Sequence, residues 1–314
     1  METPTSRELQ AIKNLKQIAR EEFIAPGTAV CGGCGGLEAL RLAAKVLGPN
    51  TIFVNAAGCF TLLATFPYTP FHGSWLYTTM ASAAAGAQGV RDALDVLMAR
   101  GKMDAADDVE VVVVAGDGST YDMGLSSISG ALFRDLDFWY FCYDNEAYGN
   151  TGMQMSSATP YGVRTLTTPR SARNRVGTEH GKKDLFAIWQ AHRPAYLATI
   201  SPRYPVDLTN KFLKARTLRG PKLFLAHAPC PTGWLYDPAE TAEYAHLAVE
   251  TGVFALKEAI DGQVTHTYVP QRRRPVEAYL QGQGRYRHLF EPTRQEDALA
   301  RIQADVDAYW AQWS

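Results

Sequence analysis

The sequence predicts an α/β protein built on a doubly wound, mostly parallel sheet. Short apolar runs alternate with segments of helical spacing, which is the pattern of parallel strands joined by helices. The run at 109–118, VEVVVVAGDG, is almost continuously apolar, as expected of a central strand covered on both faces. The chain has 314 residues and no internal repeat. We expect one domain over 1–230 and a C-terminal extension over 231–314 that packs on the core or on partner subunits.

Composition and charge exclude several classes of protein. Hydrophobic residues make up 46% and charged residues 20% of the chain, which excludes wholesale disorder. With 31 basic and 32 acidic residues, the net charge of −1 argues against nucleic-acid binding driven by overall charge. No apolar run approaches the roughly 20 residues that span a bilayer, and the polar N-terminus lacks the apolar stretch of a signal peptide. We therefore expect a soluble cytoplasmic protein without nucleic-acid or membrane partners.

The N-terminal part of the chain predicts two helices and a strand. Residues 1–23 have the spacing of an amphipathic helix, which Pro26 and Gly27 would end. The glycine-dense stretch 30–48 has helical spacing in its second half. Residues 51–60, TIFVNAAGCF, indicate a short buried strand that runs into a turn of small residues.

The central part predicts two further helix–strand pairs. Residues 78–100 form a helix rich in Ala and Gly, a composition that lets other backbone or a flat ligand approach closely. The strand at 109–118 is followed by a helix at 122–136 and by a second buried strand at 137–145, DFWYFCYDN.

The remaining chain is less regular. Residues 148–183 show no clear periodicity, whereas 185–192 and 206–216 have helical spacing. Residues 221–230, PKLFLAHAPC, predict another buried strand, and the tail from 231 onward is more polar with several helical patches.

The strongest local motif is GDGSTYDMG, which follows the apolar strand directly. It places the carboxylate of Asp117 at the carboxyl edge of a parallel sheet, where ligand sites of α/β proteins form. Gly116 and Gly118 would let backbone approach a diphosphate, and Asp117 could hold the Mg²⁺ that accompanies it. Between Gly118 and Asp144 lie 25 residues, and Asn145 then ends the next strand. This spacing resembles the thiamin-diphosphate fingerprint; the alternative is a β-turn with a helix-capping aspartate.

The five cysteines divide into two kinds. Cys142 lies inside an apolar strand and is expected to be a buried small hydrophobe. The other four lie in turns: Cys31, Cys34, Cys59 and Cys230. Four thiolates suit a structural zinc ion or a [4Fe–4S] cluster, and unliganded thiols remain an alternative. Because only one pair is local in sequence, the spacing favours a cluster held within a preformed fold.

A basic segment at 164–183 accompanies these motifs. It carries Arg164, Arg170, Arg173, Arg175, Lys182 and Lys183 against Glu179 alone. Most such runs are solvated loops, but this one follows closely on Asn145, so contact with a phosphate or an acidic partner is the alternative.

Taken together, the motifs resemble the thiamin-diphosphate-binding β subunit of 2-oxoacid:ferredoxin oxidoreductases, the group of pyruvate synthase and oxalate oxidoreductase. The resemblance covers nearly the whole chain. Its most specific part is YDNEAYGNTGMQMSSATPYG at 143–162, and it includes CGGCG at 31–35, GKKDL at 181–185, APCPTGW at 228–234 and PVEAYLQGQGRYRHL at 275–289. The basic segment between 163 and 180 departs from many relatives, which leaves the substrate open.

The resemblance implies a set of site residues. It makes Cys31, Cys34, Cys59 and Cys230 the ligands of one [4Fe–4S] cluster, and Asp117, Asn145 and the backbone carbonyl of Ala147 the ligands of Mg²⁺. It places Asn150 near the reacting centre. The implied cofactor-binding residues are Gly58, Cys59, Gly116, Asp117, Gly118, Ser119, Asn145, Asn150 and Thr151.

The implied activity is thiamin-dependent oxidative decarboxylation of a small 2-oxoacid such as pyruvate, or of oxalate, with electrons passing through the cluster to ferredoxin. The implied partners are the other subunits of the complex, of the α and γ/δ type, because the remaining half of the active site lies on them in that family. Two alternatives stay open: a non-redox thiamin-dependent decarboxylase or ligase subunit, and a zinc-clamped α/β assembly subunit.

Overall fold

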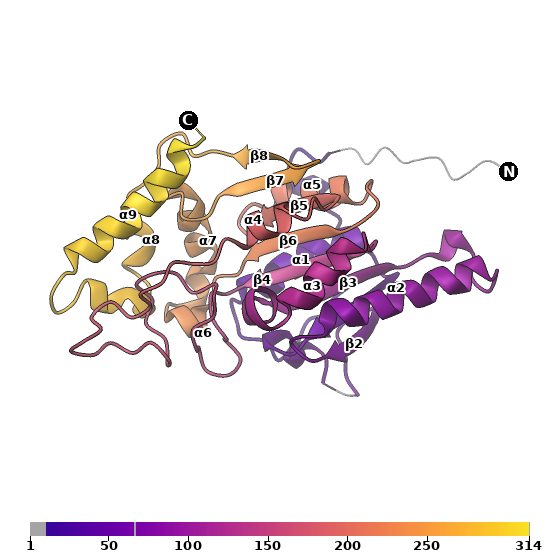
Figure 1. Cartoon of the computed structure of the whole chain (residues 1–314), viewed down its shortest axis with the longest axis horizontal. Helices are drawn as coiled ribbons and strands as arrows, with labels where there is room; N and C mark the ends of the chain where they lie inside the picture. The colour runs from indigo at the N-terminus through magenta and orange to yellow at the C-terminus, as the bar shows by residue number, and fades with distance from the viewer. Residues whose placement is uncertain (1–10, 66, 314) are drawn as a thin grey trace.

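Parallel strands form the centre of the molecule, because their apolar runs can be buried by helices on both faces. The computed structural model describes residues 11–65 and 67–313, and these form one eight-stranded sheet of order β2-β1-β3-β4-β6-β5-β7-β8 (Figure 1). The strands are β1 (Thr51–Ala56), β2 (Ser74–Thr78), β3 (Glu110–Gly116), β4 (Trp139–Asp144), β5 (Tyr196–Ile200), β6 (Lys222–His227), β7 (Leu256–Ile260) and β8 (Gln263–Tyr268). The first six pair in parallel, whereas β7 and β8 add antiparallel strands at one edge.

The register of the central strands sets the position of the site. Gly116 at the end of β3 lies opposite Tyr143 of β4, and Asp144 at the end of β4 lies opposite His227 of β6. The chain therefore leaves these three neighbouring strands at one carboxyl edge, where Asp117 and Asn145 follow.

Alternate strand residues face two helical layers. On one face, α1 (Gly35–Leu47) and α5 (Pro205–Ala215) cover a core that includes Trp139 and Phe224. On the other face, α2 (Ala83–Ala99), α3 (Leu125–Phe133) and α4 (Leu185–Gln190) cover a core that includes Tyr140 and Cys142. The period-2 alternation of a strand explains how each continuous apolar run serves both cores.

The C-terminal part builds a third apolar cluster at one end of the molecule (Figure 1). It contains α6 (Pro231–Trp234), α7 (Thr241–Glu250), α8 (Glu277–Leu280) and α9 (Glu296–Ala311). The short 3-10 segments are η1 (Leu15–Gln17), η2 (Cys59–Leu63), η3 (Ala105–Asp107), η5 (Pro238–Glu240) and η6 (Gly284–Leu289), and η4 (Gly118–Met123) is a π-helix. The π-helix η4 follows Asp117 directly and leads into α3.

The predicted strands and most of the predicted helices are confirmed, with boundaries a few residues shorter. Cys142 is buried within β4, as expected. Residues 148–183 hold no helix or strand beyond the isolated bridge between Tyr148 and Gln154. Within the described residues, no helix is both long enough and apolar enough to cross a bilayer.

The predicted helix at 1–23 is wrong where the chain is described, and residues 1–10 lie outside the described part. Residues 11–23 contain only η1. Long-range contacts hold the segment in a largely non-helical path, because Asn210 exchanges hydrogen bonds with the backbone of Ile12 and Ile24 pairs with Phe71. Leu15 stays largely exposed, so an apolar helical face would have had no core to cover.

A core stack offers a test of this architecture. The rings of Trp139, Phe212 and Phe224 stack, with centroids 5.5 Å apart for Trp139–Phe212 and 4.0 Å for Phe212–Phe224. We predict that Phe212→Ala lowers the free energy of unfolding by about 3–5 kcal/mol, because it leaves a cavity in the layer between α5 and the sheet. The matched control is Phe133→Ala on α3, whose ring is 87% exposed and should contribute less than about 0.5 kcal/mol. Urea unfolding of the isolated chain checks this, and similar losses for both variants would contradict it.

Candidate functional site

A cavity of about 170 Å³ opens at the carboxyl edge where β1, β3 and β4 end. Every residue predicted to bind the cofactor or Mg²⁺ lines it: Gly58, Cys59, Gly116, Asp117, Gly118, Ser119, Asn145, Ala147, Asn150 and Thr151. Asn150 and Thr151 are exposed at its rim, whereas Asp117 is fully buried. Segments far apart in sequence thus meet as the motifs predicted.

Three polar groups converge inside this cavity. The terminal atom of the Asn145 amide that faces Asp117 lies 2.8 Å from Asp117 Oδ1 and 2.7 Å from the carbonyl oxygen of Ala147. If that atom is nitrogen, it donates two hydrogen bonds; if it is oxygen, three oxygen atoms surround a place for a cation. The second carboxylate oxygen of Asp117 accepts a hydrogen bond of 2.5 Å from Ser156 Oγ. Burial, followed by the neighbouring Asp144, raises the pKa of Asp117 well above its usual range.

The two glycines around Asp117 serve close packing of tyrosines. A Cβ on Gly118 would lie 2.2 Å from the ring of Tyr148, and one on Gly116 would lie 3.0 Å from the ring of Tyr143. Neither position could carry a side chain without moving a ring that lines the same cavity. Glycine is therefore required here by the protein's own packing.

The four turn cysteines form a second group beside the cavity. Burial raises the pKa of Cys59 to about 12, and the next contributions come from Cys230 and Cys34. Burial likewise raises the pKa of Cys230 to about 11, with Cys34 and Cys31 adding to it. Charges act on one another in this way only at short range, so Cys31, Cys34, Cys59 and Cys230 lie near one another, and of the four only Cys59 lines the cavity. Among the described residues, no three His, Cys, Asp or Glu side chains are grouped to hold a single metal ion.

Three of these thiols stand where helical segments begin. Cys34 precedes α1, Cys59 opens η2, and Cys230 precedes α6. Cys230 Sγ accepts a hydrogen bond of 3.3 Å from the backbone of Gly233, and backbone N–H groups of Leu37 and Gly36 oppose the burial that raises the pKa of Cys34. Backbone donors at these positions stabilise negative charge on sulfur.

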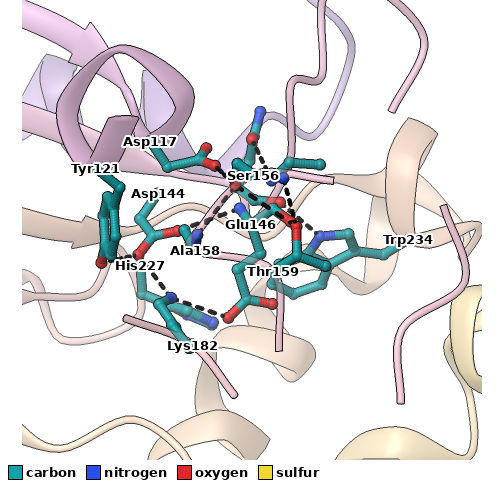
Figure 2. A network of polar contacts seen from close by, with 12 residues as sticks. Asp117, Tyr121, Asp144, Glu146, Ser156, Ala158, Thr159, Lys182, His227 and Trp234 are labelled. Atoms are coloured by element: carbon teal, nitrogen blue, oxygen red, sulfur yellow. Dashed lines mark hydrogen bonds and ion pairs between the residues drawn. The ribbon is translucent and has the colours of Figure 1, made fainter. Parts of the chain in front are cut away.

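A buried ion-pair network holds Glu146, which lies between the predicted metal ligands Asn145 and Ala147. Glu146 is buried with a left-handed φ of 66°, and its carboxylate lies 2.7 Å from Arg285 and 3.3 Å from Lys182. Lys182 also lies 2.6 Å from Asp144, whose carboxylate accepts a hydrogen bond from Tyr121 (Figure 2). Burial alone would raise the pKa of Glu146, but Lys182 and Arg285 hold it below its usual value.

Trp234 connects this network to the cysteine group. Its indole N–H donates a hydrogen bond of 3.0 Å to the backbone carbonyl of Asn145 (Figure 2). The Arg285 guanidinium lies 3.7 Å from the Trp234 ring centroid. Cys230 caps the start of α6 and Trp234 is the last residue of that helix. The hydrogen bond of Trp234 therefore ties the Cys230 turn to the Asn145 turn.

Sequence reasoning did not identify several members of this network: Glu146, Ser156, Trp234 and Arg285. The only available signal was their position inside the longer motifs at 143–162, 228–234 and 275–289. The basic segment divides in two. Lys182 and Lys183 turn inward, Lys183 toward Tyr121 and Asp122. The arginines of the segment are exposed, and Arg164 and Arg170 line a separate cavity of about 600 Å³ with Arg287.

Comparison with known proteins agrees with this geometry. Residues 56–225 match the family described as thiamine pyrophosphate enzyme, C-terminal TPP binding domain. Pyruvate synthase subunit PorB of Methanothermobacter thermautotrophicus is 46% identical over 293 residues, covering 93% of this chain and 97% of that protein. Ketoisovalerate oxidoreductase subunit VorB of Pyrococcus abyssi is 38% identical, covering 88% and 89%. A solved 2-oxoglutarate:ferredoxin oxidoreductase from Magnetococcus marinus shares the fold, with a TM-score of 0.54 and 21% identity over 71% of this chain and 79% of that chain.

The ion-pair network generates a stability prediction. We expect Arg285→Met to lower the free energy of unfolding by about 3 kcal/mol or more, because Glu146 keeps a buried charge with one cation fewer. The matched control is Arg287→Met in the same 3-10 segment, where the side chain is exposed and the loss should stay below about 0.5 kcal/mol. Urea unfolding of both variants measures the difference. An Arg285→Met protein as stable as the control would mean that Lys182 alone compensates Glu146.

Proposed function

Because the chain belongs to the family of β subunits of 2-oxoacid:ferredoxin oxidoreductases, we propose that it holds thiamin diphosphate through Mg²⁺ and keeps a [4Fe–4S] cluster beside it. The proposed reaction is oxidative decarboxylation of a small 2-oxoacid, with pyruvate as the first candidate. The observation that carries the proposal is the adjacency of two sites: Cys59 lines the same cavity as Asp117, and the Asn145 amide that faces Asp117 at one end lies 3.8 Å from Cys59 Sγ at the other.

The Asp117 carboxylate, the Asn145 amide and the Ala147 carbonyl, which we call the oxygen group, fit Mg²⁺ in chemistry and charge. Asp117 Oδ1 and the Ala147 carbonyl oxygen lie 2.8 and 2.7 Å from the same end of the Asn145 amide, so the three groups can present oxygen, the ligand that Mg²⁺ prefers, to one place. Three buried carboxylates lie at this site, Asp117, Asp144 and Glu146, and the cations that form ion pairs with them are Lys182 and Arg285. Asp117 contacts the Ser156 hydroxyl and the Asn145 amide but forms no ion pair among the described residues, so a bound cation would balance its charge.

When bound, thiamin diphosphate supplies the carbon nucleophile that adds to the 2-oxo group and allows CO₂ to leave. The protein's part is to position and to shield. Asp117, Asn145 and the Ala147 carbonyl would hold the metal and thereby the diphosphate, while Gly58, Ser119 and Thr151 line the cavity around it. Asn150 at the rim would contact the reacting atoms, where its amide can donate to a developing negative charge.

The thiol group fits an iron–sulfur cluster. Three of the four thiols lie where backbone N–H groups begin a helical segment, and such donors stabilise the negative charge of a cluster and its thiolates. Cys31 is the exposed member of the four, whereas Cys34, Cys59 and Cys230 are partly buried. A zinc ion at the same cysteines is the competing assignment, and colour separates them: a cluster absorbs broadly in the visible range and bleaches with dithionite.

We propose that partner subunits of the α and γ/δ type complete the active site and carry electrons on to ferredoxin, in the cytoplasm. Tyr77 and Met123 are more than half exposed and line a second, open hollow of about 740 Å³, which shares Ala57, Tyr77 and Met80 with the cofactor cavity and is where we propose that another subunit packs. We further propose that residues 1–230 bind the cofactors and that 231–314 form an extension. Arg285 and the third apolar cluster tie this extension to the site.

The substrate is identified by assaying the whole complex, because we propose that partner subunits complete the active site. Reduction of ferredoxin or a viologen dye is measured with pyruvate, 2-oxoisovalerate, 2-oxoglutarate and oxalate, each with and without coenzyme A. The proposal expects pyruvate to be the best substrate. Preference for oxalate without coenzyme A would overturn the pyruvate assignment, and decarboxylation without dye reduction would favour the non-redox alternative.

The cysteine assignment makes a paired prediction. Cys230→Ser should lose or convert the cluster, because the serine oxygen replaces one of four sulfur ligands. Cys142→Ser should keep the iron, since Cys142 is buried inside β4. Iron and sulfide analysis of the two purified variants decides the matter, and equal iron loss would mean that the ligand set is wrong.

The metal assignment makes a second prediction. Asp117→Asn keeps the size of the side chain but removes its charge, so magnesium-dependent binding of thiamin diphosphate should weaken at least 100-fold, which is about 2.7 kcal/mol. Iron content should stay unchanged, because the cysteines come from other turns. Calorimetric titration of cofactor into wild type and variant, each with iron measured, provides both readouts. Near-wild-type affinity with magnesium present would reduce Asp117 to a structural residue.

A further inference from the structure

We propose that Asn145 couples the two sites: magnesium binding turns its side-chain amide so that the N–H₂ end donates a hydrogen bond to Cys59 Sγ. The inference rests on the proposed function, since it needs both the metal and the cluster. The metal site would thereby act on the cluster through the side chain of Asn145.

The geometry of a planar amide gives the argument. One end of the Asn145 amide faces Asp117 Oδ1 and the Ala147 carbonyl, and the other end lies 3.8 Å from Cys59 Sγ. The two ends are chemically different, because one is an acceptor and the other a donor. Whichever end faces the oxygens, the opposite end faces the sulfur.

The occupant of the oxygen group selects between the two orientations. Without a cation, the nitrogen end satisfies Asp117 and Ala147 with hydrogen bonds of 2.8 and 2.7 Å, and the amide oxygen then faces Cys59. With Mg²⁺ bound, the oxygen end must face the metal, because an amide nitrogen is not a magnesium ligand. The N–H₂ end is then directed at the sulfur.

Gly149 packs directly against the contact between Asn145 and Cys59. A Cβ on Gly149 would lie 2.7 Å from Asn145 Nδ2 and 3.3 Å from Cys59 Sγ. A side chain at position 149 would therefore collide with the Asn145 amide. Its φ lies outside the left-handed region, so alanine meets a steric rather than a conformational obstacle there.

The consequence is a change in the cluster's reduction potential. A donor to a cluster thiolate stabilises the added electron, whereas a carbonyl oxygen in the same place repels it. Magnesium and cofactor binding should therefore make the cluster easier to reduce. The charge of Asp117 also acts on Cys59 directly. When the metal neutralises Asp117, the cluster also becomes easier to reduce. The potential alone therefore cannot reveal the hydrogen bond, which needs a separate measurement.

Pulsed electron paramagnetic resonance of the dithionite-reduced complex supplies that readout. With asparagine labelled at its side-chain ¹⁵N, a nitrogen coupling to the reduced cluster should be present with Mg²⁺ and thiamin diphosphate. The coupling should be lost when both are removed. The same coupling in both states, or in neither, would overturn the inference. Iron content and calorimetric cofactor binding are measured on the same samples, so a protein without iron or without cofactor affinity counts against the proposed function instead.

Two glycine variants separate the hydrogen bond from the direct charge effect. Gly149→Ala should displace the Asn145 amide, abolish the nitrogen coupling and retain the iron. Gly181→Ala is the matched control, because a Cβ there meets no atom within 4 Å. In wild type and control, cofactor and metal should change the ratio of reduced to oxidised cluster at a fixed potential by about tenfold, which is 59 mV for a one-electron couple. In Gly149→Ala the change should fall below about threefold. A Gly149→Ala complex with the full change and the full coupling would contradict the proposal.

Discussion

The constraint on which the site depends is the burial of negative charge at the ends of two neighbouring strands. Asp117, Asp144 and Glu146 are all buried at the ends of β3 and β4, where two parallel strands leave the sheet side by side. Isolated carboxylates are costly in such a place. Lys182 and Arg285 compensate two of them, and the third is set against the amide of Asn145. The cavity therefore contains a carboxylate that is not compensated by a cationic side chain, and this favours the binding of a cation.

The neighbouring positions of β3 and β4 and the meeting of Asp117 with Asn145 follow from local patterns, but the contacts that support this site do not. The runs at 109–118 and 137–145 predict neighbouring strands, and their tips bring Asp117 to Asn145 as the spacing implied. The strands β2, β5, β7 and β8 were not predicted; β7 (Leu256–Ile260), for example, carries Lys257 and Glu258 in its middle and so lacks a continuous apolar run. Residues 11–23 show the reverse error, in which helical spacing is overridden by contacts with Asn210.

The partners of Glu146 could not be inferred from spacing, since Lys182 and Arg285 come from distant segments. Lys182 belongs to a basic segment whose arginines are exposed, and Arg285 belongs to a polar stretch near the end of the chain. Only the fold distinguishes the inward Lys182 from those exposed arginines, or Arg285 from the exposed Arg287 two residues later. Long-range ion pairs of this kind have no local sequence pattern.

The contacts between the two ends of the chain have a consequence for how the protein is made. Gly33 in the first cysteine turn accepts a hydrogen bond from Thr241, and Glu146 receives Arg285. A nascent chain whose last residues, about thirty of them, are still inside the ribosome therefore leaves Glu146 without Arg285, whatever part of the sheet has already folded. A chain cut short by a premature stop codon before residue 230 lacks Thr241 and Arg285, so neither contact can form, and it also lacks Cys230, one of the proposed cluster ligands.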